Sequence, residues 1–110
     1  MKPDIVMYSR TTGCPFITVA RRVFDDYGLD YREIFIDEDD AARERVLRWT
    51  GFLAVPTIVL AEPGSDLPIS EPEPLPTGAS PRGIDRGHMI TEASNDALLS
   101  WLRRHELLAD

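Results

Sequence analysis

Apolar and polar positions alternate along the chain in a way that predicts short strands and amphipathic helices in turn. Residues 5–8 form an apolar run between Pro3 and a polar stretch, and this predicts a buried strand at the centre of a sheet. Over residues 14–27 apolar side chains recur at helical spacing, with Pro15 suited to the first helical position and Gly28 to the stop. The pattern therefore predicts a strand followed by a helix.

A second unit of strand and helix follows. Residues 31–36 alternate, and this predicts a strand whose two faces carry Tyr31, Glu33 and Phe35 on one side and Arg32, Ile34 and Ile36 on the other. Residues 41–50 have a helical pattern, the acidic run 37–40 offers N-cap residues, and Gly51 closes the helix. Its expected apolar side consists of Ala42, Val46, Leu47 and Trp49.

The last part of the chain contains two further strands, a long loop and a helix. Residues 55–60 predict a strand with Pro56 at its beginning, where a missing N–H does least harm to the ladder. Six of the nine prolines lie in residues 63–81, so we interpret residues 61–86 as a loop insertion. A short strand over 88–91 and a helix capped by Ser94 or Asn95 complete the order βαβαββα. The expected apolar side of that helix is Leu98, Leu99, Trp101, Leu102 and Leu107.

Length, charge and cysteine content narrow the class of protein. The 110 residues fit one domain spanning the whole chain, and the single cysteine excludes an intramolecular disulfide. The net charge of −7 argues against electrostatic binding to nucleic acid or to anionic membranes. The first residues lack the apolar stretch of a signal peptide or membrane span. We therefore expect a cytoplasmic protein, and a monomer.

The single cysteine, Cys14, stands where a strand ends and a helix begins. At a helix start, unpaired N–H groups and the positive end of the helix dipole favour a thiolate, and cysteines in such places have pKa values of about 3.5–7.5. Cys14 is therefore a candidate reactive thiol. The alternative is an inert, partly buried cysteine.

These motifs together resemble the glutaredoxin branch of the thioredoxin fold. The segment Ile5–Ser9 followed by Cys14-Pro15-Phe16 resembles that family's first strand and Cys-Pro-Tyr-Cys motif, and Val55-Pro56-Thr57 resembles its proline loop. Residues 90–98 are most similar to the mycoredoxin-like and ribonucleotide-reductase-associated glutaredoxins. The resemblance covers residues 4–60 and 88–103, and it implies an α/β fold with a four-stranded mixed sheet flanked by helices.

The chain departs from this family at three places. Ile17 replaces the second cysteine of the motif, so a dithiol cycle within one chain is excluded. Pro15 stands where the cluster-binding monothiol members carry glycine, which makes an iron–sulfur cluster carrier the less favoured alternative. One extra residue precedes Cys14 and the usual Gly-Gly-x-Asp-Asp is lost, which leaves the identity of the small thiol open.

The resemblance implies a monothiol oxidoreductase that removes a small thiol, such as glutathione, from thiolated protein substrates through catalytic Cys14. The small thiol is then a cosubstrate, and no tightly bound cofactor or metal is expected. The amides of Phe16 and Ile17 and the hydroxyls of Thr11 or Thr12 are expected to stabilise the thiolate, since Pro15 has no N–H.

Five further residues are candidates for binding the small thiol. Arg10 is expected to pair with a carboxylate, and Val55 to offer its backbone to the thiol's cysteinyl peptide, provided that Pro56 is cis as the resemblance implies. Ser94 and Asn95 are candidates to receive a second carboxylate through free N–H groups, although such residues are more often plain helix caps.

Two further interpretations remain open. A thioredoxin-fold binding module without turnover is the main rival function, because the second cysteine is missing. The insertion 61–86 is either a tolerated surface loop or a lid or docking element. His88 and His105 are expected at the surface rather than in a metal site.

Overall fold

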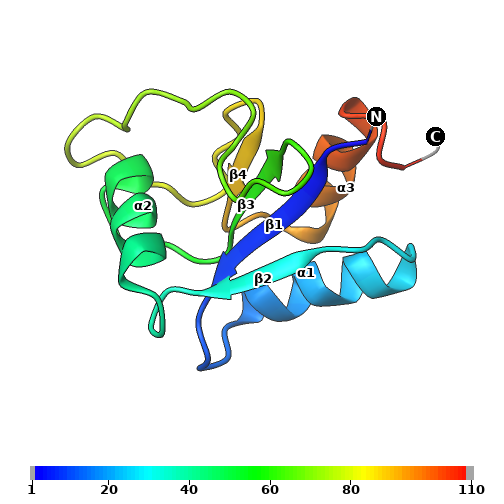
Figure 1. Cartoon of the computed structure of the whole chain (residues 1–110), viewed down its shortest axis with the longest axis horizontal. Helices are drawn as coiled ribbons and strands as arrows, with labels where there is room; N and C mark the ends of the chain where they lie inside the picture. The colour runs from blue at the N-terminus through cyan, green and yellow to red at the C-terminus, as the bar shows by residue number, and fades with distance from the viewer. Residues whose placement is uncertain (1, 109–110) are drawn as a thin grey trace.

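A four-stranded mixed sheet in the order β2-β1-β3-β4 forms the centre of the fold (Figure 1). The computed structural model describes residues 2–108. Along this chain the elements are β1 (Asp4–Ser9), α1 (Pro15–Asp26), β2 (Arg32–Phe35), α2 (Asp40–Thr50), β3 (Thr57–Ala61), β4 (Met89–Thr91) and α3 (Asn95–Arg104). This is the predicted order βαβαββα.

The strand β1 lies inside the sheet, as its apolar run predicted. It pairs in parallel with β2 and antiparallel with β3, and β3 pairs antiparallel with β4. Because β1 and β2 are parallel, their carboxyl ends meet at one edge of the sheet, and both helix α1 and the loop before α2 begin there. This edge positions the candidate site.

Helix boundaries follow the capping residues that the sequence offers. Cys14 is the N-cap of α1 and Pro15 its first residue, while Asp39 caps α2 by accepting a hydrogen bond from the amide of Ala42 at 3.0 Å. Gly51 ends α2 with a φ of +78°, a left-handed conformation that glycine adopts without a steric penalty. The predicted boundaries of α1 and α2 are confirmed within one residue. The last helix ends at Arg104, so Leu107, which was expected on its apolar side, is buried but lies beyond the helix.

The helices cover the sheet from two sides. On one side α1 packs with α3, and the ring of Phe24 lies 4.6 Å from that of Tyr31. On the other side α2 packs through Trp49, whose ring meets Tyr8 edge to face at 5.3 Å. One prediction for α2 was wrong: Leu47 is 39% exposed, and Thr50 is buried in its place, because Leu47 lies on the solvent side of the helix.

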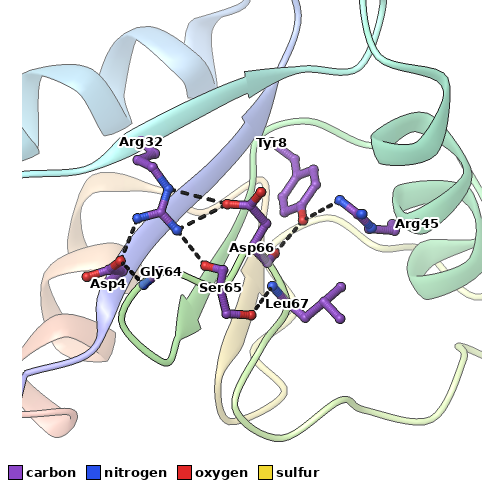
Figure 2. A network of polar contacts seen from close by, with 8 residues as sticks. All are labelled: Asp4, Tyr8, Arg32, Arg45, Gly64, Ser65, Asp66 and Leu67. Atoms are coloured by element: carbon purple, nitrogen blue, oxygen red, sulfur yellow. Dashed lines mark hydrogen bonds and ion pairs between the residues drawn. The ribbon is translucent and has the colours of Figure 1, made fainter.

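The insertion follows a defined path over the α2 side of the sheet (Figure 1). It begins in a polar network that Figure 2 shows. The guanidinium of Arg32 pairs with the carboxylates of Asp4 and Asp66, and the buried hydroxyl of Tyr8 donates a hydrogen bond to the backbone carbonyl of Asp66. Burial raises the pKa of Tyr8, so the hydroxyl stays protonated and remains a donor.

The middle and the end of the insertion are attached as well. The carboxylate of Glu71 accepts hydrogen bonds from the indole N–H of Trp49 at 2.6 Å and from Arg48 at 2.8 Å, both on α2. Further on, the amide of Gly83 donates to the carbonyl of Thr91 at 2.8 Å, so the end of the insertion runs beside β4. The described chain between β3 and β4 is thus a loop without helix or strand, as predicted, but it is held at three places.

Candidate functional site

Cys14 lies at the edge of the sheet where β1 ends and α1 begins. Its backbone is extended, with φ −152° and ψ 144°, and its carbonyl accepts the first helical hydrogen bond from the amide of Thr18 at 3.1 Å. The thiol is neither fully buried nor fully exposed. Cys14 is therefore half-buried as a residue, at the rim of the core.

The thiol faces the loop that precedes β3. Its Sγ lies 3.9 Å from the carbonyl oxygen of Val55, to which it donates a long hydrogen bond. The peptide bond between Val55 and Pro56 is cis. The amide of Glu92 donates to the carbonyl of Pro56 at 2.9 Å, which attaches this loop to the end of β4. The structure therefore brings Cys14, Val55 and Pro56 together, although they are about forty residues apart in sequence.

The expected stabilisers of the thiolate are arranged differently from the prediction. The side chain of Cys14 accepts no capping hydrogen bond, so the amides of Phe16 and Ile17 do not bind the sulfur in this structure, where it is a donor to Val55. The side chain of Ile17 is buried in the core. Because position 17 lies in the core, an apolar residue fits there, where the resemblance places a second cysteine.

Thr11 is engaged elsewhere. Its hydroxyl donates to the carboxylate of Asp37, and its amide donates to the same carboxylate at 3.1 and 3.2 Å. The single hydroxyl proton is thus committed to Asp37 and does not reach Cys14. The hydrogen bonds from Thr11, with a smaller contribution from the nearby charge of Arg10, hold the pKa of Asp37 below its ordinary value. Thr12 is exposed in the same loop.

Asp37 is a site residue that the sequence reasoning assigned only to a helix cap. The cap of α2 is Asp39, while Asp37 ties the loop before Cys14 to the end of β2. The sequence did contain a signal for this. Asp37 directly follows the strand predicted over residues 31–36, and if that strand runs parallel to β1, Asp37 lies beside the loop that follows β1.

The candidate residues for small-thiol binding fall into two groups. Arg10 is exposed at the Cys14 edge and shares a cavity of about 130 Å³ with Asp37, Arg43 and Leu53. Arg43 was not singled out from the sequence, because a single arginine in the first turns of a helix is more often a solvated charge.

Ser94 and Asn95 lie at the start of α3. The hydroxyl of Ser94 accepts a hydrogen bond from the amide of Ala97 at 3.2 Å, which makes Ser94 the cap. The side-chain amide of Asn95 lies 3.4 Å from the carboxylate of Asp96. The cap is confirmed, and a role for these two residues in ligand binding stays a prediction.

A groove opens next to the Val55 loop. Its cavity volume is about 450 Å³, and it lies between the loop after α2, the insertion and the end of β4. Its lining includes Phe52, Leu53 and Ala54 on one wall and Pro81, Arg82 and Glu92 on the other. Because Ala54 directly precedes Val55, the groove borders the candidate thiol site.

No group of three or more residues suited to hold a metal ion occurs within residues 2–108. The two histidines were expected at the surface, but they are half-buried, and the rings of His88 and His105 lie 5.3 Å apart. Nε2 of His105 donates a hydrogen bond to the carbonyl of Gly87 at 2.8 Å, and burial lowers the pKa of its imidazole. The ring of His105 also meets that of Trp101 in α3 at 5.3 Å.

None of the helices between residues 2 and 108 has the length and apolar character needed to span a membrane.

Comparison with known proteins connects this arrangement to one family. The family model described as Glutaredoxin matches residues 5–62, which is more than half of the chain and includes Cys14 and the Val55 loop. No protein with a curated description matches the chain.

The fold also has a counterpart among solved structures. The chain is similar to the crystal structure of the holo form of glutaredoxin C1 from Populus tremula x tremuloides, with a TM-score of 0.50 and 16% sequence identity. The match covers 96% of this chain and 79% of that chain. It confirms the thioredoxin-like α/β fold that the resemblance implied.

Proposed function

The chain belongs to the glutaredoxin family, and from this premise we propose that it is a monothiol thiol-disulfide oxidoreductase. In this proposal Cys14 removes a small thiol, glutathione or an analogue, from thiolated protein substrates. Members of the family are typically oxidoreductases that use glutathione as cosubstrate. The monothiol route is proposed because Cys14 is the only cysteine of the chain.

The observation that carries the proposal is the position of the Cys14 sulfur. It belongs to a half-buried residue at a helix start and faces the carbonyl of Val55 at 3.9 Å, next to a cis proline. Within residues 2–108 the amide of Val55 donates to no backbone carbonyl. The carbonyl of Val55 stands beside the sulfur and its amide is not used within the backbone, so the two groups suit an extended cysteinyl peptide that pairs with them in the manner of a strand.

The proposed reaction is two successive thiol-disulfide exchanges. In the first, the Cys14 thiolate attacks the glutathione-side sulfur of the mixed disulfide, and the protein substrate leaves as its thiolate. In the second, a free small thiolate attacks the sulfur of the small thiol now bound to Cys14. The Cys14 thiolate is released together with the oxidised small-molecule disulfide. One free small thiol is consumed, and the disulfide bond passes from the protein substrate to a pair of small-thiol units.

Several finer features belong to the same proposal. Arg10, with Arg43 beside it, is placed to pair with a carboxylate of the small thiol, and Ser94 and Asn95 are candidates for a second one. We assign the chain to the mycoredoxin-like and ribonucleotide-reductase-associated subgroup because of residues 90–98. A cytoplasmic setting is part of the proposal as well, since thiol chemistry of this kind needs a reducing compartment.

The test is deglutathionylation of a glutathionylated peptide, followed as release of the free peptide in the presence of reduced glutathione. We expect turnover by the native chain and none by Cys14→Ser, whose fold is checked by circular dichroism. Thr18→Ala is a matched control, because it changes a small hydroxyl residue one helical turn from Cys14 without touching the sulfur. Residual turnover in Cys14→Ser would exclude the mechanism.

A second candidate function is a binding module that retains the thiol without turnover. It is favoured by the buried side chain of Ile17 in place of a second thiol and by the absence of a capping hydrogen bond to the Cys14 sulfur. The two candidates differ in the second exchange step. In a binding module, the adduct of Cys14 with glutathione persists when millimolar reduced glutathione is added, whereas an oxidoreductase releases it.

A further inference from the structure

The groove beside the Val55 loop has one wall that comes from the insertion. Residues 78–82 form this wall, and Phe52, Leu53 and Ala54 face them from the loop after α2. A cavity of about 450 Å³ is in the size range of small-ligand sites, which is about 300–1,000 Å³. Neither the family model, which ends at residue 62, nor the predicted set of site residues includes this wall.

The insertion is held firmly where it reaches the groove. Immediately after Arg82, the amide of Gly83 donates to the carbonyl of Thr91 at 2.8 Å, and the amide of Thr91 donates to the carbonyl of Ile84 at 3.0 Å. Just before it, the hydroxyl of Ser80 accepts a hydrogen bond from the amide of Arg82 at 3.3 Å. The backbone of Arg82 is therefore fixed to β4.

The side chain of Arg82 lies over the residue that follows the Cys14-Pro15 pair. Its guanidinium carbon is 5.4 Å from the centre of the Phe16 ring, within the range of a cation–π contact. Its Nε lies 3.7 Å from the carboxylate of Glu92, whose side chain is only 17% exposed. The Arg82 side chain is itself 69% exposed, and these two contacts place its guanidinium at the edge of the groove, where a ligand can reach it from solvent.

The guanidinium still has donors to offer. The ion pair with Glu92 uses Nε, and the terminal nitrogens of Arg82 make no hydrogen bond within residues 2–108. A planar pair of N–H donors of this kind fits a carboxylate through two parallel hydrogen bonds. Besides Arg82 and its partner Glu92, the groove is lined by apolar side chains and small residues, so Arg82 is the one cationic group among the residues that line it.

We propose that Arg82 of the insertion is a specificity-determining residue that binds a carboxylate of the small thiol carried on Cys14. This inference rests on the proposed function, and it names the ligand class: small thiols that bear a carboxylate are favoured over those that lack one. The insertion is then a part of the thiol site rather than a tolerated surface loop. Glu92 is the positioning residue that holds the guanidinium in place.

The test measures how readily Cys14 forms a mixed disulfide, and it does not need turnover. The protein is equilibrated with oxidised and reduced glutathione at a fixed ratio, and separately with the corresponding pair of glutathione diethyl ester, which has no free carboxylate. The loaded fraction is read by intact mass spectrometry. The ratio of the two exchange constants gives the preference for the free acid.

Three variants separate the effect of Arg82 from that of net charge. For Arg82→Gln we expect the preference for the free acid to fall about tenfold, which corresponds to ~1.4 kcal/mol. Arg103→Gln is the matched control: it removes one positive charge from the last turn of α3, and we expect it to leave the preference unchanged. Arg82→Lys retains the charge and is expected to keep most of the preference.

The outcomes are distinct. An unchanged preference in Arg82→Gln, or an equal fall in Arg103→Gln, would overturn the inference and leave the proposed function standing. A loss in Arg82→Lys as large as in Arg82→Gln would also overturn it, since the cause would then be lost packing on Phe16. If neither probe loads the native protein, the proposed function and this inference both fall.

Discussion

Glu92 has an unfavourable backbone conformation at the edge of the candidate site, and its replacement by glycine should stabilise the backbone there. Its φ is +47°, in the left-handed region, where a residue with a Cβ is strained and glycine is not. Strain of this kind persists where surrounding contacts maintain it. Here those contacts are the ion pair with Arg82 and the hydrogen bond from the Glu92 amide to the carbonyl of Pro56.

The magnitude follows from a comparison of alanine and glycine at the same position. Both variants remove the carboxylate, so their difference isolates the backbone. Left-handed geometry destabilises the folded alanine variant by roughly 1–2 kcal/mol. The greater freedom of glycine in the unfolded chain opposes this, because it destabilises the glycine variant by about 0.4–1 kcal/mol. We therefore expect Glu92→Gly to be more stable than Glu92→Ala by about 1 kcal/mol.

The assay is urea unfolding followed by circular dichroism, with equal slopes required for all variants. Glu44 provides the matched control, because it is an exposed glutamate inside helix α2. There glycine should be less stable than alanine by about 1 kcal/mol, which is the opposite sign. The same sign at positions 92 and 44, or a Glu92→Gly protein less stable than Glu92→Ala, would refute the reasoning.

Three other predictions concern residues away from Glu92. Ile17→Cys should form a disulfide with Cys14 under oxidant, because the two positions are three residues apart in the first helical turn; a titration that finds both thiols free would contradict this. Glu71 has a lowered pKa because of hydrogen bonds from Trp49 and Arg48, so its stabilising contribution is present above about pH 4.5 and is lost as the pH falls through the folded-state pKa. The native protein should thus lose its stability advantage over Glu71→Gln in acid, and a constant difference from pH 7 to 3 would exclude this. Tyr8→Phe should cost about 1 kcal/mol in urea unfolding, since a buried hydroxyl that anchors the insertion is lost, and an unchanged midpoint would show that the anchor contributes nothing.

The elements of the fold could be predicted because each is marked by local chemistry. Pro15 and Gly28 delimit α1, and Gly51 ends α2 in a left-handed conformation, so these boundaries depend on residues within one turn. The two faces of β2 follow from strict alternation. Leu47 shows the limit: helical spacing allowed it on the apolar side, but in the folded chain it is 39% exposed while Thr50 is buried.

The candidate site could be predicted in part. Cys14 and the Val55 loop were recognised from short motifs, and the structure brings them within 3.9 Å. Thr11 donates its hydroxyl to Asp37 instead of to Cys14, because Asp37 follows β2 and comes beside the loop after β1 only once these two strands pair. A side chain cannot be assigned its hydrogen-bond partner from sequence when that partner is distant in the chain.

What the sequence by itself determined is the order of the elements, the single thiol at a helix start and the family to which they point. These depend on periodicity, capping and short motifs, which are properties of neighbouring residues. The tertiary structure alone decided the path of the insertion and the placement of Arg82 over Phe16, sixty-six residues earlier in the chain. Contacts of that kind depend on how strands pair and on where a loop of irregular backbone finds hydrogen bonds, and no local pattern encodes either.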